Sequence, residues 1–292
     1  MGRLERLLVP VTGDAHSLYA LDQILEFAAT RKCRVAVLSV VPPYTGDLGS
    51  SALADLRRLL RQPGELALAR ALEMANARGM DIDCLCEEGE PFEVIVDAAR
   101  RLKADLIAMG VADRSALGRL VRGNVPLRTI GHSEHDVLLV PQGAALGFRS
   151  ILLATDGSRY CTYAAVTALQ LAREHDADLH VLYVADLTDW AFPDSAEGQL
   201  AADMEVEHGR AVVEAIAARA AQEGVRARGH VAQGEAAERI LATAKRLGAE
   251  CLFIASHGKG GLARLLLGSV AEEVVASSRI PVYVAVRDRL RR

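Results

Sequence analysis

The chain has 292 residues, of which 51% are hydrophobic and 25% are charged, and its formal net charge at pH 7 is -4. This length favours two domains with cores large enough to fold without a metal or a disulfide, and the composition excludes a disordered chain. The absence of a basic surplus and the low aromatic content of 4% argue against a nucleic-acid partner.

The first half of the chain alternates short apolar runs with stretches of helical period. Apolar runs at residues 7–13, 37–40 and 136–140 predict strands. The stretch around Cys84 and Cys86 predicts a further strand, in which both thiols face the core. Between residues 92 and 102, apolar side chains recur at a spacing that predicts an amphipathic helix.

The second half repeats the first half at a spacing of 144 to 145 residues. The matching segments are residues 7–13 with 151–157, 37–40 with 181–184, 89–90 with 234–235, and Gly123 with Gly268. The predicted strands of this half are Leu152–Thr155, Leu179–Val184, Val225–Val231, Cys251–Ile254 and Val282–Val286, and helical stripes occupy residues 213–220 and 237–247. The repeat predicts two homologous domains, 1–141 and 150–292, joined by residues 142–149.

Strands that are apolar along their whole length and alternate with helices predict a parallel sheet covered by helices on both faces. Right-handed crossovers then give each domain a doubly wound α/β fold. In such a sheet, ligands bind at the carboxyl ends of the strands, where the strand order reverses. A functional site is therefore expected in the loops that follow the first and fourth strands.

Two loops of the second domain contain residues suited to a phosphate-bearing ligand. In the loop after the first strand, Asp156 could accept hydrogen bonds from ribose hydroxyls or help to hold a metal on phosphates. The loop after the fourth strand ends in Gly268-Ser269, where Ser269 is predicted to be a helix N-cap and Glu272 to complete a capping box. Glycines before a helix expose backbone N–H groups that bind anions. Taken singly, each motif is more often an ordinary turn or an ordinary cap.

Together these residues resemble the universal stress proteins. That family has the pattern Gly-x-x-Gly-(nine residues)-Gly-(Ser or Thr), and this chain has Ala255-x-x-Gly258-(nine residues)-Gly268-Ser269, after a first strand that ends in Ala-Thr-Asp-Gly-Ser. The resemblance covers nearly the whole chain, twice over. It implies Rossmann-like domains with strand order 3-2-1-4-5, a pseudo-twofold relation between them through their last strands, and, in one branch of the family, bound ATP.

The resemblance also implies which residues bind the nucleotide. Asp156 is expected beside the ribose and phosphates, and Val184 is expected to contact adenine through its backbone. The full set of expected nucleotide-binding residues is Ala154, Thr155, Asp156, Val184, Ile254, Ala255, His257, Gly258, Gly268, Ser269 and Val270. Ala255 departs from the family pattern because it replaces the first glycine, and its methyl group could crowd the ribose.

The first domain departs further from the family pattern. Thr12 stands where the second domain has Asp156, and in the loop at residues 110–124 Asp113 replaces the second glycine and Asn124 the serine. At about 4 Å and an effective dielectric constant of about 20, two like unit charges repel each other by about 4 kcal/mol. Asp113 would therefore oppose a triphosphate, and we expect the first domain to be a degenerate, structural copy.

The sequence thus predicts a stress-response protein that binds ATP, with or without Mg²⁺, in its second domain. The alternative is an adaptor of the same fold that binds a protein partner without a nucleotide. Enzymatic activity is disfavoured, apart from slow ATP hydrolysis, because no catalytic set converges in the sequence and it lacks the Gly-x-x-x-x-Gly-Lys-(Ser or Thr) loop. We expect a homodimer with no protein metal site.

The odd number of scattered cysteines, five, fits a reducing compartment. No apolar run approaches the length of a membrane span, and the start of the chain has no apolar signal-peptide core. We therefore expect a cytoplasmic protein without a membrane partner.

Overall fold

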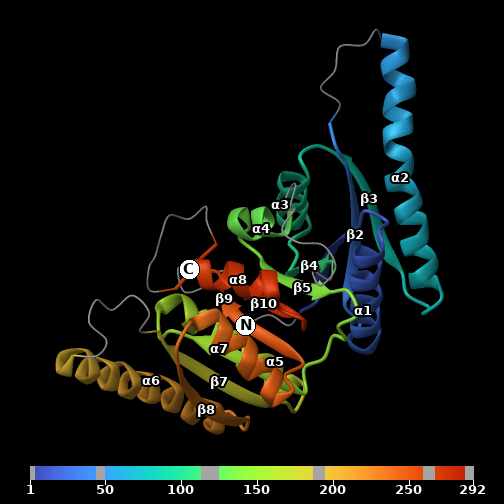
Figure 1. The fold of residues 1–292 in the computed structure, drawn as a ribbon. Coiled ribbons are helices and arrows are strands. Elements are labelled where there is room, and N and C mark those ends of the chain that lie inside the picture. Colours follow the sequence, from blue (N-terminus) through green and yellow to red (C-terminus); the bar gives the residue numbers. More distant parts are fainter. Residues whose placement is uncertain (1–3, 44–49, 113–124, 187–194, 259–266, 287–292) are drawn as a thin grey trace. The chain divides into compact units, whose positions relative to one another are not determined.

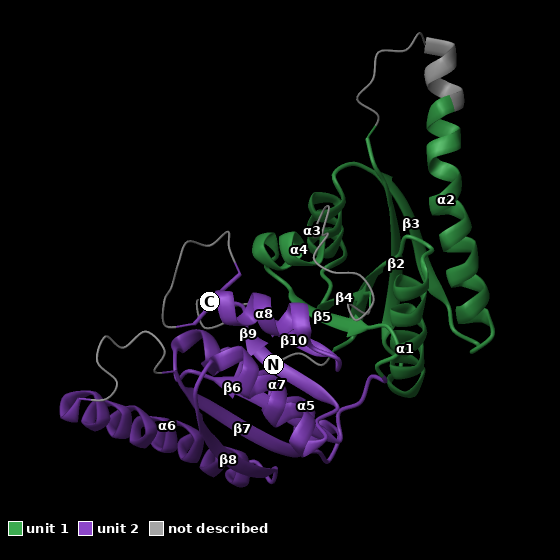
Figure 2. Cartoon of the chain, in the orientation of Figure 1, with its two compact units in different colours: residues 1–144 green, residues 145–292 purple. Residues whose placement is uncertain are grey.

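The structure is a computed structural model that describes residues 4–43, 50–112, 125–186, 195–258 and 267–286. The chain divides into two compact units, Met1–Ala144 and Ala145–Arg292 (Figure 2). Within the described ranges, no helix combines the length and the hydropathy that a membrane span requires. The domain boundaries 1–141 and 150–292, and the pseudo-twofold relation, stay predictions.

Unit 1 is a parallel sheet covered by helices (Figure 1). Its elements are β1 (Arg6–Pro10), α1 (Ala15–Arg31), β2 (Arg34–Val41), α2 (Ser50–Asn76), β3 (Ile82–Glu88), α3 (Pro91–Leu102), β4 (Leu106–Val111), α4 (Val125–His132) and β5 (Asp136–Pro141). The strands follow the order β3-β2-β1-β4-β5.

Unit 2 repeats this plan. Its elements are β6 (Ser150–Thr155), α5 (Arg159–Glu174), β7 (Asp178–Ala185), α6 (Ala196–Gln222), β8 (Arg226–Gln233), α7 (Ala236–Leu247), β9 (Cys251–Ala255), α8 (Ser269–Ser277) and β10 (Val282–Ala285). The parallel strands follow the order β8-β7-β6-β9-β10. The doubly wound α/β fold and the order 3-2-1-4-5 are confirmed in both units.

The predicted apolar runs are the buried centres of the sheets. In unit 2, Leu152 and Phe253 are fully buried, and the ring of Phe253 stacks on that of Tyr283 with 4.6 Å between the centroids. Helix α6 lies close to β7 because Gly209 faces the ring of Tyr183, where a Cβ would come within 2.5 Å of a ring carbon. Close packing of this kind fixes the sheet that carries the site.

The prediction that Cys84 and Cys86 both face the core is wrong for Cys84. Both residues lie on β3, which is the edge strand of its sheet. Cys86 is half-buried beside Gly64 of α2, whereas Cys84 is exposed. An edge strand lacks a neighbour on one side, so its residues are less covered than those of an inner strand.

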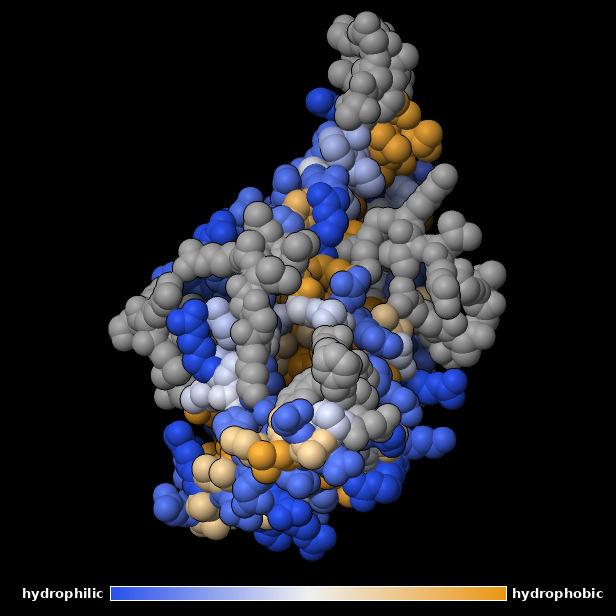
Figure 3. All heavy atoms as spheres, turned by 60° about the vertical axis from the view of Figure 1, so that its left-hand side comes forward, coloured by the Kyte–Doolittle hydropathy of each residue, from blue (hydrophilic) through white to orange (hydrophobic). Residues whose placement is uncertain are grey.

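Both long helices expose apolar side chains. Leu59 and Leu66 of α2 are 62% and 63% exposed, and Leu200 and Met204 of α6 are 62% and 66% exposed. Figure 3 shows an apolar patch on α2, at the top of the view. Single exposed apolar residues are common on protein surfaces and do not by themselves indicate a partner.

A histidine pair joins β7 and β8. Nδ1 of His180 lies 3.1 Å from Nε2 of His230, and both rings are partly buried. Burial lowers the pKa of both imidazoles, and the positive charges of Arg228 and Arg246 lower it further, while Asp178 opposes the shift at His180. The folded protein therefore favours the neutral pair.

The histidine pair predicts a loss of stability in acid. Because the folded pKa lies below the ordinary value of 6.5, the unfolded chain takes up protons first as the pH falls through 6.5. The contribution of the pair to the free energy of unfolding should be complete above that pH and decrease below it. Urea unfolding at a series of pH values, compared with the double variant His180→Gln and His230→Gln, measures this contribution. Equal pH dependence of the two proteins would refute the prediction.

Candidate functional site

A crevice lies at the carboxyl ends of β6, β7 and β9 in unit 2. The chain leaves β6 towards β7 on one side, and β9 lies on the other side of β6, so the strand order reverses at this point. The carboxyl edge of a parallel sheet at such a reversal is the usual ligand position of a doubly wound fold. The crevice therefore lies where the sequence predicted a site.

The turn after β6 fixes the position of Asp156. Gly157 has a φ of +75°, which favours glycine, and its N–H donates to Oγ1 of Thr155 at 3.1 Å. Oδ1 of Asp156 accepts from the N–H of Ser158 at 2.8 Å and from Sγ of Cys161 at 3.1 Å. Ser158 then caps α5 by accepting from the N–H of Cys161. These bonds hold the carboxylate at the mouth of the crevice.

The segment after β9 approaches Asp156 closely because it contains a glycine. A Cβ on Gly258 would lie 2.6 Å from Oδ2 of Asp156. The far end of this loop is tied back, since the N–H of Gly268 donates to the carbonyl of Ser256 at 3.0 Å. Residues 259–266 of the glycine pattern lie outside the described residues.

The predicted capping box at α8 is wrong. Gly268, with φ −62° and ψ 145°, is the N-cap, and Ser269 is the first residue of the helix. The carbonyl of Gly268 accepts the first helical bond from the N–H of Glu272 at 2.8 Å. A glycine cap has no side-chain oxygen, so it leaves the first N–H groups of the helix without a side-chain acceptor. Among the described residues, the crevice therefore ends at a helix N-terminus that no side chain caps.

The crevice has a volume of about 470 Å³. One end is apolar, with Leu182 and Val184 of β7 facing Ile240 of α7. The other end contains the start of α8. Asp156 lies between the two ends, because it follows β6, which lies between β7 and β9 in the sheet. Such a volume and division suit a small ligand with one apolar and one polar part.

All of the sequence-predicted site residues line this one crevice. They are Ala154, Thr155, Asp156, Val184, Ile254, Ala255, His257, Gly258, Gly268, Ser269 and Val270. The structure adds further lining residues, which are Cys161, Leu182, Ala236, Ile240, Ser256, Leu267, Ala271 and Glu272. Ile240 lies on the predicted apolar stripe of α7, and Leu182 lies two residues before Val184 on the same strand, but neither pattern separates a crevice residue from a core residue. That these residues bind a nucleotide stays a prediction.

Two other side chains define the chemistry of the crevice. Nδ1 of His257 lies 3.0 Å from Oγ of Ser256, and its buried Nε2 has no hydrogen-bond partner among the described residues. Burial, with the nearby charge of Asp156, raises the pKa of the Cys161 thiol to about 12. Cys161 is therefore protonated at neutral pH and is no nucleophile.

At the corresponding corner of unit 1, the described side chains after β1 bond to one another and to the first turn of α1. The hydroxyl of Thr12 donates to Asp14, which caps α1 by accepting from the N–H of Ser17 at 2.8 Å and pairs with His16 at 3.2 Å. A Cβ on Gly110 would lie 2.2 Å from the carbonyl oxygen of His16, so α1 runs directly against the end of β4. Asp113 and Asn124 lie outside the described residues.

Comparison with known proteins gives the same family for both halves. The model of the universal stress protein family matches residues 3–141 and 147–287. A universal stress protein of Mycolicibacterium smegmatis is 28% identical over 298 residues, which cover 97% of this chain and 97% of that protein. A universal stress protein of Methanocaldococcus jannaschii is 30% identical over 143 residues, covering 49% of this chain and 84% of that protein.

One solved structure agrees on the fold of the whole chain. The crystal structure of a universal stress protein from Archaeoglobus fulgidus has a TM-score of 0.74 and 21% sequence identity, and covers 97% of this chain and 96% of that chain. A shorter universal stress protein, solved in complex with cAMP, covers 48% of this chain with a TM-score of 0.38.

The chain is a tandem pair of Rossmann-like α/β domains, with a crevice at the strand ends of unit 2. The chain belongs to the universal stress protein family, with one copy of the family fold in each half.

Proposed function

We propose that this protein is a stress-response protein that binds ATP in the crevice of unit 2, while unit 1 is a structural copy. One observation carries the proposal: an apolar recess and a bare helix N-terminus line the same crevice, with a carboxylate between them. Adenine, phosphates and ribose are the groups that these three features suit.

The apolar end accounts for the base. Leu182, Val184 and Ile240 offer aliphatic surface to a flat ring, and the carboxyl end of β7 carries backbone groups that can read the ring edge. Asp156 is held by Ser158, so its carboxylate is positioned to accept from a ribose hydroxyl. Hydrogen bonds to a charged group are worth about 1.5–3 kcal/mol each.

The polar end accounts for the phosphates. The N–H groups of Ser269 and Val270 lie in the first turn of α8, where the helix dipole favours negative charge. The charged lining residues among the described ones include two carboxylates, Asp156 and Glu272, and no lysine or arginine. Mg²⁺ bound to the phosphates would offset this negative charge, so we expect Mg²⁺ to increase affinity for ATP.

The adaptor alternative is favoured by the same two carboxylates, which oppose an anionic ligand. Release of a nucleotide on denaturation of the purified protein, followed by titration with ATP, discriminates between these functions. Slow hydrolysis would appear as phosphate release above that of a variant that does not bind ATP.

Isothermal titration of the intact protein with ATP and Mg²⁺ should give one site per chain. Ser269→Pro is the informative variant, because proline fits the first helical position and the extended conformation of Gly268, yet removes one N–H. We expect it to weaken ATP binding by about 10- to 100-fold, the value of one charged hydrogen bond.

Ser269→Ala is the matched control, since it removes the hydroxyl and keeps the N–H. Its affinity should stay close to that of the unmodified protein. Two equivalent ATP sites per chain would refute the structural role of unit 1. If ATP does not bind, or if the proline and alanine variants bind it equally well, the proposed phosphate site is wrong. If cAMP binds more tightly than ATP, the ligand of the crevice is cAMP and not ATP.

A further inference from the structure

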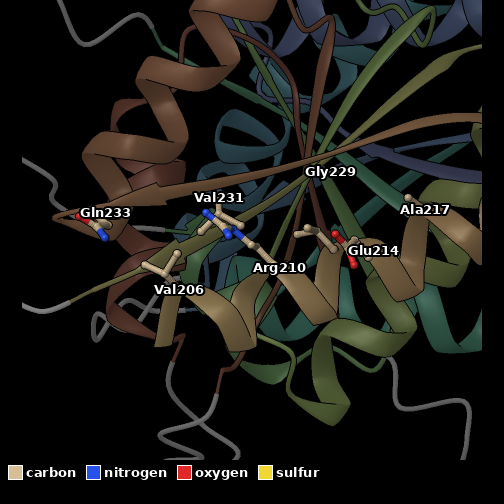
Figure 4. Close-up of a pocket in the computed structure, with 8 residues that line it drawn as sticks. Val206, Arg210, Glu214, Ala217, Gly229, Val231 and Gln233 are labelled. Atoms are coloured by element: carbon tan, nitrogen blue, oxygen red, sulfur yellow. The ribbon is translucent and has the colours of Figure 1, made fainter. Parts of the chain in front are cut away.

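A second hollow, of about 460 Å³, lies between α6 and the edge strand β8 of unit 2, on a different part of the unit from the ligand crevice (Figure 4). Helix α6 contributes Val206, Arg210, Val213, Glu214 and Ala217, which recur every three or four residues and so form one stripe. Strand β8 contributes Gly229, Val231 and Gln233. We call this hollow the α6–β8 groove.

The floor of the α6–β8 groove carries open backbone groups. The N–H of Gly234 donates to the carbonyl of Ala185 on β7 at 3.2 Å. Because backbone groups alternate in direction along a strand, Gly229, Val231 and Gln233 point their N–H and C=O groups the other way, towards the outer edge. In unit 2, β8 is the last strand of its sheet. Such an edge is a template for one more strand.

The charges of the α6–β8 groove are complementary to those of the same groove in a second copy of the chain. Figure 4 shows the Arg210 side chain extending from α6 towards Val231, with Glu214 one turn further along the helix. Within the chain, Arg210 pairs with Glu207 at 3.4 Å, and because this pair is exposed, the guanidinium can also pair with a carboxylate of a second copy. If two copies of α6 lie antiparallel about a twofold axis between Arg210 and Val213, Arg210 of each copy faces Glu214 of the other. The same axis sets Val206 opposite Ala217. In a twofold interface each such contact occurs twice.

The same axis fits the strand. Gly209 of α6 lies over Tyr183, which is the register partner of Val231 on β8. Val213 of α6 lies over Gly229 of β8. The middle of the helical stripe therefore lies at the level of His230. Antiparallel pairing about His230 sets Gly229 of one copy opposite Val231 of the other, and both of these residues have outward-pointing backbone groups. Helix and strand thus specify one and the same axis.

We propose that the α6–β8 groove binds a second copy of this chain, which continues the sheet through β8 and pairs the two α6 helices. The occupant is a second copy because both the charges and the strand satisfy one twofold axis. This interface uses none of the residues that line the ligand crevice and does not depend on the proposed nucleotide.

Charge reversal tests the proposal. Arg210→Glu places a carboxylate against Glu214 of the second copy, and Glu214→Arg places two guanidinium groups together. Each should raise the dissociation constant of the dimer by about tenfold or more, whereas the double variant restores the attraction and the dimer. Sedimentation velocity over about 1–100 µM measures the constant. Arg219→Glu, a charge reversal on α6 outside the groove, is the control.

Val231→Pro provides a second test, because it removes an outward N–H and leaves the bonds to β7 intact. A folded, monomeric protein by circular dichroism and sedimentation is expected. A wild-type chain that stays monomeric throughout the concentration series would overturn the proposal. So would a dimer that neither the single reversals nor Val231→Pro weaken, or one that the double reversal does not restore.

Discussion

We expect Gly110→Ala to destabilise unit 1 by about 3 kcal/mol and to lower its unfolding temperature by about 10 °C. The added Cβ would lie 2.2 Å from the carbonyl oxygen and 2.6 Å from the carbonyl carbon of His16, and 2.9 Å from Cα of Ser17. All three are backbone atoms of α1, so no side-chain rotation relieves the contact. Helix α1 must move away from the end of β4. Differential scanning calorimetry of the intact chain measures the loss.

The second half of the chain supplies the matched control. Ala255 of β9 is the residue of unit 2 that corresponds to Gly110 of β4. Unlike Gly110, it already carries a methyl group. The reverse substitution, Ala255→Gly, creates no overlap and should cost only about 1 kcal/mol, through the added freedom of the unfolded chain. It should affect unit 2 and leave unit 1 unchanged. A Gly110→Ala protein as stable as the unmodified one would show that α1 is free to shift.

The difference between Gly110 and Ala255 also explains an asymmetry between the units. In unit 1, the first turn of α1 occupies the space beside the end of β4. In unit 2, the equivalent position carries the methyl group of Ala255, which lines the crevice. That the methyl group of Ala255 could crowd the ribose stays a prediction.

Much of the fold was predictable because it depends on the composition of whole segments. Strands buried on both faces must be apolar along their length, and the predicted and observed strands differ by only a few residues, as at β8. Helix α6 was recognised only over residues 213–220, although it spans Ala196–Gln222. Its buried residues are Gly209, Val213 and Ala220, whereas Leu200 and Met204 in its first turns are exposed, so these turns have no apolar face against the sheet.

The candidate site was predictable for the residues that belong to its two loops, because glycine and aspartate are restricted there by backbone geometry. Leu182 and Ile240 were not selected, since an apolar residue that lines a crevice has the same sequence pattern as one in the core. The helix cap was misplaced by one residue for a similar reason. Serine is the commoner cap, and only the dihedral angles of Gly268 identify the glycine as the N-cap.

We expect Gly258→Ala to weaken ATP binding by tenfold or more. The added Cβ would lie 2.6 Å from Oδ2 of Asp156, so the carboxylate has to rotate or the segment after β9 has to retreat. Rotation breaks the bond between Oδ1 of Asp156 and the N–H of Ser158, which costs about 1 kcal/mol of stability, and retreat widens the crevice. Titration calorimetry measures the affinity, and urea unfolding measures the stability of unit 2.

A double-mutant cycle shows whether the contact with Asp156 is the cause. In an Asp156→Ala background the carboxylate is absent, so adding Gly258→Ala should cost no further stability, and the coupling between the two positions should be about 1 kcal/mol. If Gly258→Ala costs the same in both backgrounds, the glycine is needed for its backbone freedom and not for the approach of the loop to Asp156. If it leaves ATP affinity unchanged, the close contact has no part in binding, and the carboxylate position proposed for the ribose is wrong.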